Sequence, residues 1–155
     1  SVAFAFLVVW VPMAALGAVS HFVTVRLPQR VHRLRPWEAD GRAYEILGVR
    51  LAKRLLRRGP LAVFNPHLHL PHTRDAAGIA ALDRKMREAE ASHLILFVLT
   101  LAVVADDVAR RWWEAAGFTL LFDIVLNGYP VMLQRYNRAM LARRFGREVA
   151  APTAW

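Results

Sequence analysis

Long apolar stretches alternate with strongly basic ones along this chain of 155 residues. The first apolar stretch runs from Val2 to Val25, the second covers residues 92–109, and the third covers residues 112–133. A helix over 2–25 is roughly 36 Å long, which exceeds the hydrocarbon thickness of a typical bilayer. The pattern predicts an all-α integral membrane protein with about three transmembrane helices.

The second stretch leaves two interpretations open. Its strictly apolar core, residues 94–105, is short, and a run of about 10–14 apolar residues is often re-entrant or part of a soluble core helix. With Ser92, His93 and residues 106–109 added, the stretch reaches spanning length. We expect it to span, because the third stretch then has the orientation that the charges require.

The loop between the first and second stretches has helical patterns of its own. Residues 41–59 form a basic amphipathic pattern, with apolar positions on one side at Tyr44, Leu47, Leu51 and Leu55. A basic amphipathic helix favours the membrane surface and anionic lipid heads. A further helix begins near Asp75, and it is contiguous with the second apolar stretch, so a single unbroken helix is one possible outcome.

Charge separates the two sides of the predicted membrane protein. Of the 21 Lys and Arg residues, fourteen lie in residues 26–91, two at Arg110 and Arg111, and five in residues 134–155. By the positive-inside rule, the loop 26–91 and the tail 134–155 face the cytoplasm of a bacterial inner membrane, and the N-terminus lies outside. We expect one multi-pass membrane domain over 1–155, surrounded by membrane lipids.

The net charge of +9 raises the question of a nucleic-acid partner. The arginines flank apolar runs instead of lining one face, so no nucleic-acid partner is expected. Cysteine is absent, which excludes thiolate metal sites and a cysteine nucleophile. Three histidines, His67, His69 and His72, could hold zinc, but no acidic or cysteine ligand accompanies them, so no metal site is predicted.

A polar stripe marks the third stretch and its continuation. On a helical wheel at about 100° per residue, five polar residues fall on one side: Asp123, Asn127, Gln134, Asn137 and Arg138. A stripe of this kind is costly against lipid, so we expect it to face other helices or a wet cleft. Hydrogen bonding between helices alone is the alternative role.

Glu90 and His93 lie three residues apart and therefore share one helix face. A carboxylate beside an imidazole holds its tautomer and raises its basicity, as a general base requires. The alternative is an ion pair at the membrane interface. The G-x-S-x-G motif is absent from the sequence, so a serine-hydrolase mechanism is not expected. The nucleotide-binding motifs G-x-x-x-x-G-K-[ST] and G-x-G-x-x-G are absent as well.

Three blocks of the sequence resemble the glycosyl-4,4'-diaponeurosporenoate acyltransferase family. The first is WEADGRAYEILGVRLAKRLL, residues 37–56, although Ala52 stands where the family has tryptophan. The second is REAEASHLILF, in which Ala89, Glu90 and His93 match Ala-Glu-x-x-His. The third is NGYPVMLQRYNRAML, in which Asn127 and residues 134–138 match Asn followed by Gln-Arg-Tyr-Asn-Arg.

The resemblance implies transfer of an acyl chain to a sugar hydroxyl of a glycosylated carotenoid or similar lipid, at the cytoplasmic interface. His93 would then act as general base with Glu90 as its partner. The arginines and Asn137 would stabilise the carbonyl oxygen or bind donor phosphates. The substrate-binding residues implied are Asn127, Gln134, Arg135, Asn137, Arg138 and Trp37. The resemblance implies no cofactor and leaves the identity of the acyl donor undetermined. A carotenoid or lipid is the expected bound molecule.

A different class of function fits the same stripes. The chain could be a non-catalytic accessory subunit of a larger membrane complex, for example a photosynthetic pigment-protein complex, that binds other membrane subunits. An enzyme requires an open cleft at the inner interface, whereas a subunit would have that face covered. A transporter is disfavoured, because it normally needs paired broken helices that so short a chain cannot supply.

Overall fold

The computed structural model describes residues 1–20, 22–49, 51, 54 and 76–146. Over these residues the chain is helical and contains no strand. It divides into two compact units, Ser1–Pro28 with Glu88–Val131, and Gln29–Arg87 with Met132–Trp155. Among the described residues, three helices are long and apolar enough to cross a membrane: Val2–Val19, Ala76–Ala109 and Trp113–Phe145. The predicted all-α fold with three spanning helices is confirmed.

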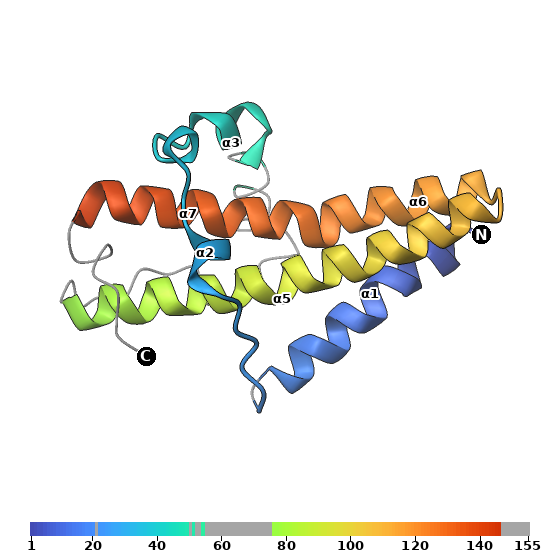
Figure 1. Ribbon diagram of the computed structural model, residues 1–155, viewed down its shortest axis with the longest axis horizontal. Helices are drawn as coiled ribbons and strands as arrows, with labels where there is room; N and C mark the ends of the chain where they lie inside the picture. Colours follow the sequence, from blue (N-terminus) through green and yellow to red (C-terminus); the bar gives the residue numbers. More distant parts are fainter. Residues whose placement is uncertain (21, 50, 52–53, 55–75, 147–155) are drawn as a thin grey trace. The chain divides into compact units, whose positions relative to one another are not determined.

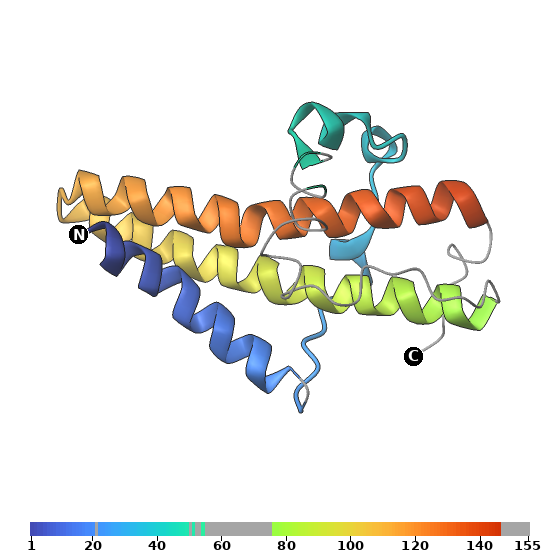
Figure 2. The same ribbon diagram turned by 180° about the vertical axis from the view of Figure 1, so that it is seen from behind.

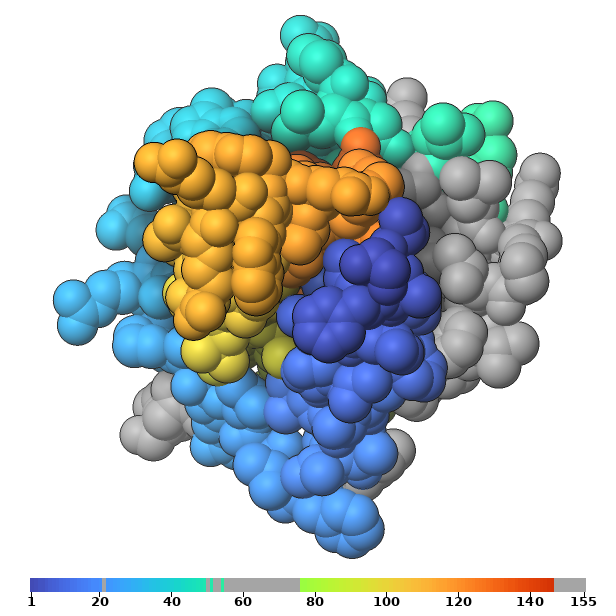
Figure 3. Space-filling model, turned by 90° about the vertical axis from the view of Figure 1, so that its right-hand side faces the viewer, coloured from blue at the N-terminus to red at the C-terminus, as the bar shows by residue number. Residues whose placement is uncertain are grey.

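In the first unit, helix α1 (Val2–Val19) packs on helix α6 (Trp113–Asp123). In Figures 1 and 2 the N-terminal part of α1 approaches α6 and the rest of α1 diverges from it, and in Figure 3 the dark blue atoms of α1 lie against the orange atoms of α6. Ala5 and Val9 are buried, and the rings of Phe6 and Phe122 meet edge to face at 5.5 Å. The contact between the two helices therefore includes large apolar side chains.

Helix α1 ends at Val19, before the predicted end of the first span at Val25. The Ser20 hydroxyl donates a hydrogen bond to the carbonyl of Gly17 at 2.6 Å. Serine competes in this way for helix carbonyls, and it is favoured at helix ends for that reason. The apolar residues Phe22 and Val23 follow outside the helix and are exposed.

Helix α5 (Ala76–Ala109) is one unbroken helix of 34 residues, which confirms the continuity between the predicted helix near Asp75 and the second span. At 1.5 Å per residue it is roughly 51 Å long, so only part of it fits within the hydrocarbon layer. Residues 76–87 belong to the second unit and residues 88–109 to the first. Val98 and Leu99 are exposed on the apolar part, as side chains against lipid would be.

The third span contains an irregular turn. Helix α6 continues into a π-helical segment, η3 (Ile124–Gly128), and then into helix α7 (Tyr129–Phe145). A π-helical turn holds more residues than an α-helical one, so it changes the direction in which the following side chains point. The predicted polar stripe on a regular helix is therefore interrupted after Asn127, although its five residues are all buried or partly buried.

The second unit packs short helices against α7. They are α2 (Gln29–His32), η1 (Pro36–Glu38) and α3 (Arg42–Ile46). The core consists of Tyr44, Val49, Leu133 and Tyr136, with Met132 and Met140 packed against it. Gly41 has a φ of 73°, and a Cβ there would lie 2.7 Å from the Met140 side chain, so the turn before α3 requires glycine.

The basic amphipathic helix predicted over 41–59 is interrupted in the described residues. Helix α3 ends at Ile46, and Gly48 adopts a φ of 77° in the turn that follows. Tyr44 is buried, whereas Leu47 and Leu51 are exposed. The predicted apolar face therefore does not form a single stripe, because a left-handed glycine redirects the chain after one helical turn. Most of the remaining predicted helix lies outside the described residues.

Candidate functional site

A chain of hydrogen bonds in the first unit joins His93, Asn127 and Asp123. His93 comes from α5, Asn127 from the π-helical segment η3, and Asp123 from the end of α6. His93 Nδ1 lies 3.1 Å from Asn127 Oδ1, and Asn127 Nδ2 donates to Asp123 Oδ1 at 2.8 Å. The Thr100 side chain also hydrogen-bonds to the Asp123 carboxyl. Residues from two spans therefore meet in one polar cluster.

These bonds determine where the imidazole proton lies. Asn127 donates to Asp123 through its amide nitrogen, so its amide oxygen is directed at His93. An amide oxygen only accepts, so His93 Nδ1 must carry the proton that it accepts. In a neutral imidazole the other nitrogen, Nε2, then has a free lone pair. In the neutral form of His93, this arrangement leaves Nε2 as the nitrogen that can accept a proton.

Burial differs among the residues of the cluster. Asp123 and Asn127 are completely buried, and Thr100 is nearly so. His93 is partly exposed. The groups that bind His93 are therefore shielded from water, which strengthens their hydrogen bonds.

Gly128 allows α5 to approach the π-helical segment closely. A Cβ at this position would lie 3.3 Å from Cε2 of Phe97 on α5. Phe97 lies one turn beyond His93 on the same helix, so this contact sets the spacing at which His93 meets Asn127. π-helical turns occur frequently at functional sites, and here the turn contains the residue that binds the histidine.

Glu90 and His93 lie on the same helix, three residues apart, as predicted. Glu90 is completely buried on α5, but the group that lies on Nδ1 of His93 is the amide of Asn127. Sequence reasoning paired Glu90 with His93 because helix spacing reveals neighbours on one helix. It identified Asn127 as a polar residue facing inward, but helix spacing says nothing about contacts between spans.

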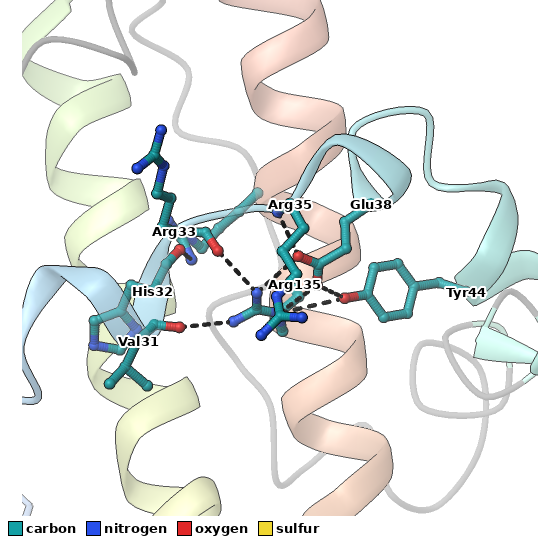
Figure 4. Close-up of polar contacts among 8 residues, drawn as sticks. Val31, His32, Arg33, Arg35, Glu38, Tyr44 and Arg135 are labelled. Atoms are coloured by element: carbon teal, nitrogen blue, oxygen red, sulfur yellow. Dashed lines mark hydrogen bonds and ion pairs between the residues drawn. The ribbon is translucent and has the colours of Figure 1, made fainter.

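In the second unit, Arg135 is held by a dense set of acceptors (Figure 4). Its guanidinium forms two bonds with Glu38, from Nε to Oε1 at 2.7 Å and from Nη2 to Oε2 at 2.9 Å. It also donates to the carbonyl of Val31 at 3.0 Å and to that of Arg33 at 3.1 Å. Arg135 therefore fixes the segment before α3 to α7 through both a carboxylate and the backbone.

Glu38 and Tyr44 complete this cluster. The Tyr44 hydroxyl donates to Glu38 Oε1, and Arg135 Nε also lies 3.3 Å from the Tyr44 oxygen. Burial opposes the charged form of Glu38, but the bonds from Arg135 and Tyr44 outweigh it and lower the pKa of Glu38 to about 2. Burial and the bond to the Glu38 carboxylate raise the pKa of Tyr44 to about 12. The cluster thus contains an ionised glutamate and a neutral tyrosine.

Arg138 forms a second clamp in the same unit. It donates to Asp83 Oδ1 at 3.0 Å and to the carbonyl of His32 at 2.8 Å, and only 6% of its side chain is exposed. Asp83 also accepts from Arg87 Nε at 2.6 Å. The Asp83 carboxylate therefore lies between two guanidiniums, and the backbone of α2 is tied to α7.

The remaining predicted site residues lie in the second unit as well. Asn137 is buried, Gln134 is partly buried, and Trp37 is more than half exposed with its ring 6.1 Å from that of Tyr44. The predicted residues thus form two groups. Glu90, His93 and Asn127 belong to the first unit, and Trp37 with the residues of 134–138 belongs to the second. Sequence reasoning missed Asp83 as a partner of this second group.

The histidines 67, 69 and 72 lie outside the described residues. In the part of the chain that the structure describes, no group of three or more His, Asp or Glu side chains is arranged to hold a metal ion.

Comparison with known proteins gives one match. A family model described as glycosyl-4,4'-diaponeurosporenoate acyltransferase matches residues 28–147. This region extends from the segment before α2 to the end of α7, and it contains every residue of the two clusters described above. Neither a curated protein nor a solved structure matches the chain.

Proposed function

Because the chain belongs to the glycosyl-4,4'-diaponeurosporenoate acyltransferase family, we propose that it is an active membrane acyltransferase. It transfers an acyl chain to a sugar hydroxyl of a glycosylated carotenoid or a similar lipid. The observation that carries this proposal is the hydrogen-bonded chain from His93 through Asn127 to Asp123. A general base needs its imidazole held in one tautomer, and this chain of hydrogen bonds holds it. Packing of the helices alone would not require the amide oxygen of Asn127 to face His93.

The proposed reaction begins when Nε2 of His93 removes the proton of the sugar hydroxyl. The hydroxyl oxygen attacks the carbonyl carbon of the activated acyl group, and a tetrahedral intermediate forms. When it collapses, the bond to the leaving group breaks, and the His93 imidazolium returns its proton to that group. The ester product and the protonated leaving group result, and His93 is neutral again.

Asn127 has the role of an orienting residue in this scheme. It accepts the proton of Nδ1 and so keeps the lone pair on Nε2, as the third residue of a catalytic triad does, and asparagine fills that role in some cysteine proteases. Asp123 in turn fixes the amide of Asn127. Glu90, one helical turn before His93, stabilises the positive charge that the imidazole acquires during transfer.

Arg135 and Arg138 act as positioning residues in the proposal. Their guanidiniums are already engaged with Glu38, Asp83 and three backbone carbonyls. An arginine used in this way has little capacity left for a donor phosphate or a carbonyl oxygen. We therefore assign them to holding the segment 29–38 in place.

The proposed setting is a bacterial inner membrane with the loop 26–91 and the tail 134–155 on the cytoplasmic side. The support is the distribution of charge, with nineteen of the 21 Lys and Arg residues in those two segments. A glycosylated carotenoid would keep its apolar chain in the hydrocarbon layer while the sugar reaches the interface.

The test is acyl transfer by the purified full chain in nanodiscs, with a glycosylated carotenoid and a labelled activated acyl donor. His93→Gln should lower kcat by about 10²–10⁴-fold, the usual contribution of a general base. Ser92→Ala, the neighbouring position on α5, is the matched control and should retain activity. Full turnover by His93→Gln would rule out the base assignment. The accessory-subunit interpretation predicts no transfer by the wild-type chain with any activated acyl donor.

A further inference from the structure

Three arginines contribute to the lining of a hollow in the second unit. The hollow has a volume of about 340 Å³ and lies along the segment that joins α2 to η1. Its lining consists of Arg30, Arg33, Leu34, Arg35, Pro36 and Ala39. The three arginines are exposed, and none of the six lining residues is acidic. A positively charged recess of this kind attracts anions.

Hydrogen bonds with the side chains of Arg135, Glu38 and Arg138 hold the backbone of this arginine-bearing segment. The Arg33 carbonyl accepts from Arg135 Nη2 at 3.1 Å, and the Arg35 amide donates to Glu38 Oε2 at 2.6 Å. The neighbouring His32 carbonyl accepts from Arg138. In Figure 4 the side chain of Arg33 extends away from the Arg135 guanidinium, while its carbonyl points toward it. The segment is therefore rigid before any ligand arrives, which reduces the entropy lost on binding.

The acidic residue of this segment does not neutralise the hollow. Glu38 is 2% exposed, and its carboxylate is engaged by Arg135, Tyr44 and the Arg35 amide. Arg30, Arg33 and Arg35 all contribute to the lining of the hollow, and that lining includes no carboxylate.

We propose that this hollow binds a phosphate-bearing group. Planar guanidiniums match phosphate oxygens in two-pronged geometry, and several of them around one recess suit a phosphate better than a single carboxylate. Two sources carry this chemistry: the head group of an anionic phospholipid, and the phosphates of a water-soluble activated acyl donor. The inference does not depend on catalysis by His93, because it concerns binding alone.

The first experiment titrates the detergent-purified full chain with inorganic pyrophosphate by isothermal calorimetry. The second titrates it with phosphatidylglycerol and counts bound lipids by native mass spectrometry, with phosphatidylcholine as the neutral comparison. Arg33→Gln and Arg35→Gln are the test variants. Arg42→Gln is the matched control, because it removes one exposed charge from the same unit outside the lining of the hollow.

Each test variant should weaken binding of a phosphate probe about tenfold, the equivalent of one charge-assisted contact. Arg42→Gln should leave it unchanged. A loss seen with pyrophosphate identifies a soluble donor as the source, and a loss seen only with phosphatidylglycerol identifies a lipid head group. Equal affinity in wild type and both test variants, or an equal loss in Arg42→Gln, would overturn the proposal. His93→Gln should bind both probes as wild type does, so failure of one proposal remains distinct from failure of the other.

Discussion

Asn127 Oδ1 lies 3.1 Å from Nδ1 of His93, although 34 residues separate the two along the chain. The contact joins the second and third apolar spans, and its direction is fixed by the bond from Asn127 to Asp123. A histidine with its proton held on Nδ1 presents the opposite nitrogen to a substrate. This relationship supports a catalytic interpretation more strongly than the presence of a histidine near a carboxylate does.

Replacing Asn127 by Ala tests the orienting role. The imidazole would lose the acceptor of its Nδ1 proton, and both tautomers would become accessible. We expect kcat to fall by about tenfold or more, but by less than in His93→Gln, because the base itself remains. KM should change little. Steady-state kinetics in nanodiscs measures both values, and a variant in which only KM rises would indicate that Asn127 binds substrate instead.

Gly128→Ala tests the spacing between α5 and the π-helical segment. The added Cβ would lie 3.3 Å from Phe97, so one element must move by a few tenths of an ångström. Alanine favours a helix over glycine by about 1 kcal/mol, and overpacking costs about as much, so the thermal unfolding midpoint should change little. Activity should fall severalfold, since catalysis depends on small differences in position.

The double variant Gly128→Ala/Phe97→Leu is the control for that experiment. Leucine has no ring at the point of contact, so it should restore the spacing and most of the activity. Gly117→Ala on α6, where a Cβ would meet nothing within 4 Å, should leave activity unchanged. Undiminished activity in Gly128→Ala would show that this close contact does not set the geometry of the site.

Local hydropathy explains why the three spans were predictable from the sequence. Apolar stretches long enough to cross a bilayer have few alternatives, because the backbone must satisfy its own hydrogen bonds in lipid. The end of α1 at Val19 was not predictable in this way, because the apolar stretch continues to Val25 without a break in hydropathy. The break at Gly48 was similarly hidden, because glycine in a helical pattern is compatible with either outcome.

The candidate site was predictable only in part. Helix spacing and the family motifs pointed to His93 and Asn127 separately, but neither shows that the two side chains meet. The partner of Arg135 was missed because Glu38 lies 97 residues away, in a basic loop without periodic pattern. Arg135 and Arg138 themselves were a usable signal for these partners. Buried arginines require carboxylates, and the sequence contains few Asp and Glu residues that could pair with them.

Arg135→Leu tests the clamp in the second unit. It would leave the buried Glu38 carboxylate without its bidentate partner and would release two backbone carbonyls. Breaking a buried pair typically costs about 3–5 kcal/mol, so we expect a destabilisation near the lower end of that range, because 15% of the Arg135 side chain is exposed. Arg135→Lys keeps the positive charge but loses the two-pronged guanidinium geometry, so it should destabilise the protein less than Arg135→Leu does.

Chemical denaturation in detergent, followed by circular dichroism, measures these differences. The double variant Arg135→Leu/Glu38→Leu removes the unpaired carboxylate and should recover part of the lost stability, as replacement of buried ion pairs by apolar residues often does. Arg42→Gln, with its exposed side chain, serves as control. If Arg135→Leu unfolds at the same denaturant concentration as wild type, Arg135 does not stabilise the unit.

The pH dependence of stability should report the same cluster at both ends of the scale. Glu38 has a pKa of about 2 instead of 4.5, so the stability from its ionised form is complete above pH 4.5 and is lost as the pH falls through about 2. Tyr44 has a pKa of about 12 instead of 10.0, so the stability from its protonated form is complete below pH 10.0 and is lost as the pH rises through about 12.

Two variants separate these limbs of the stability curve. Glu38→Gln should be less stable than wild type at neutral pH and should lose stability less steeply in acid, because the carboxyl that titrates is gone. Tyr44→Phe should flatten the alkaline limb in the same way. Thermal unfolding across the pH range measures both, with Glu114→Gln as an exposed control. Acid and alkaline limbs parallel to those of wild type would mean that neither group controls folding. A weaker pH dependence of stability in each variant would instead show that Glu38 and Tyr44 stabilise the fold through their ionisation states. At neutral pH these states are an ionised Glu38 and a protonated Tyr44, which together with Arg135 hold the arginine-lined segment in place.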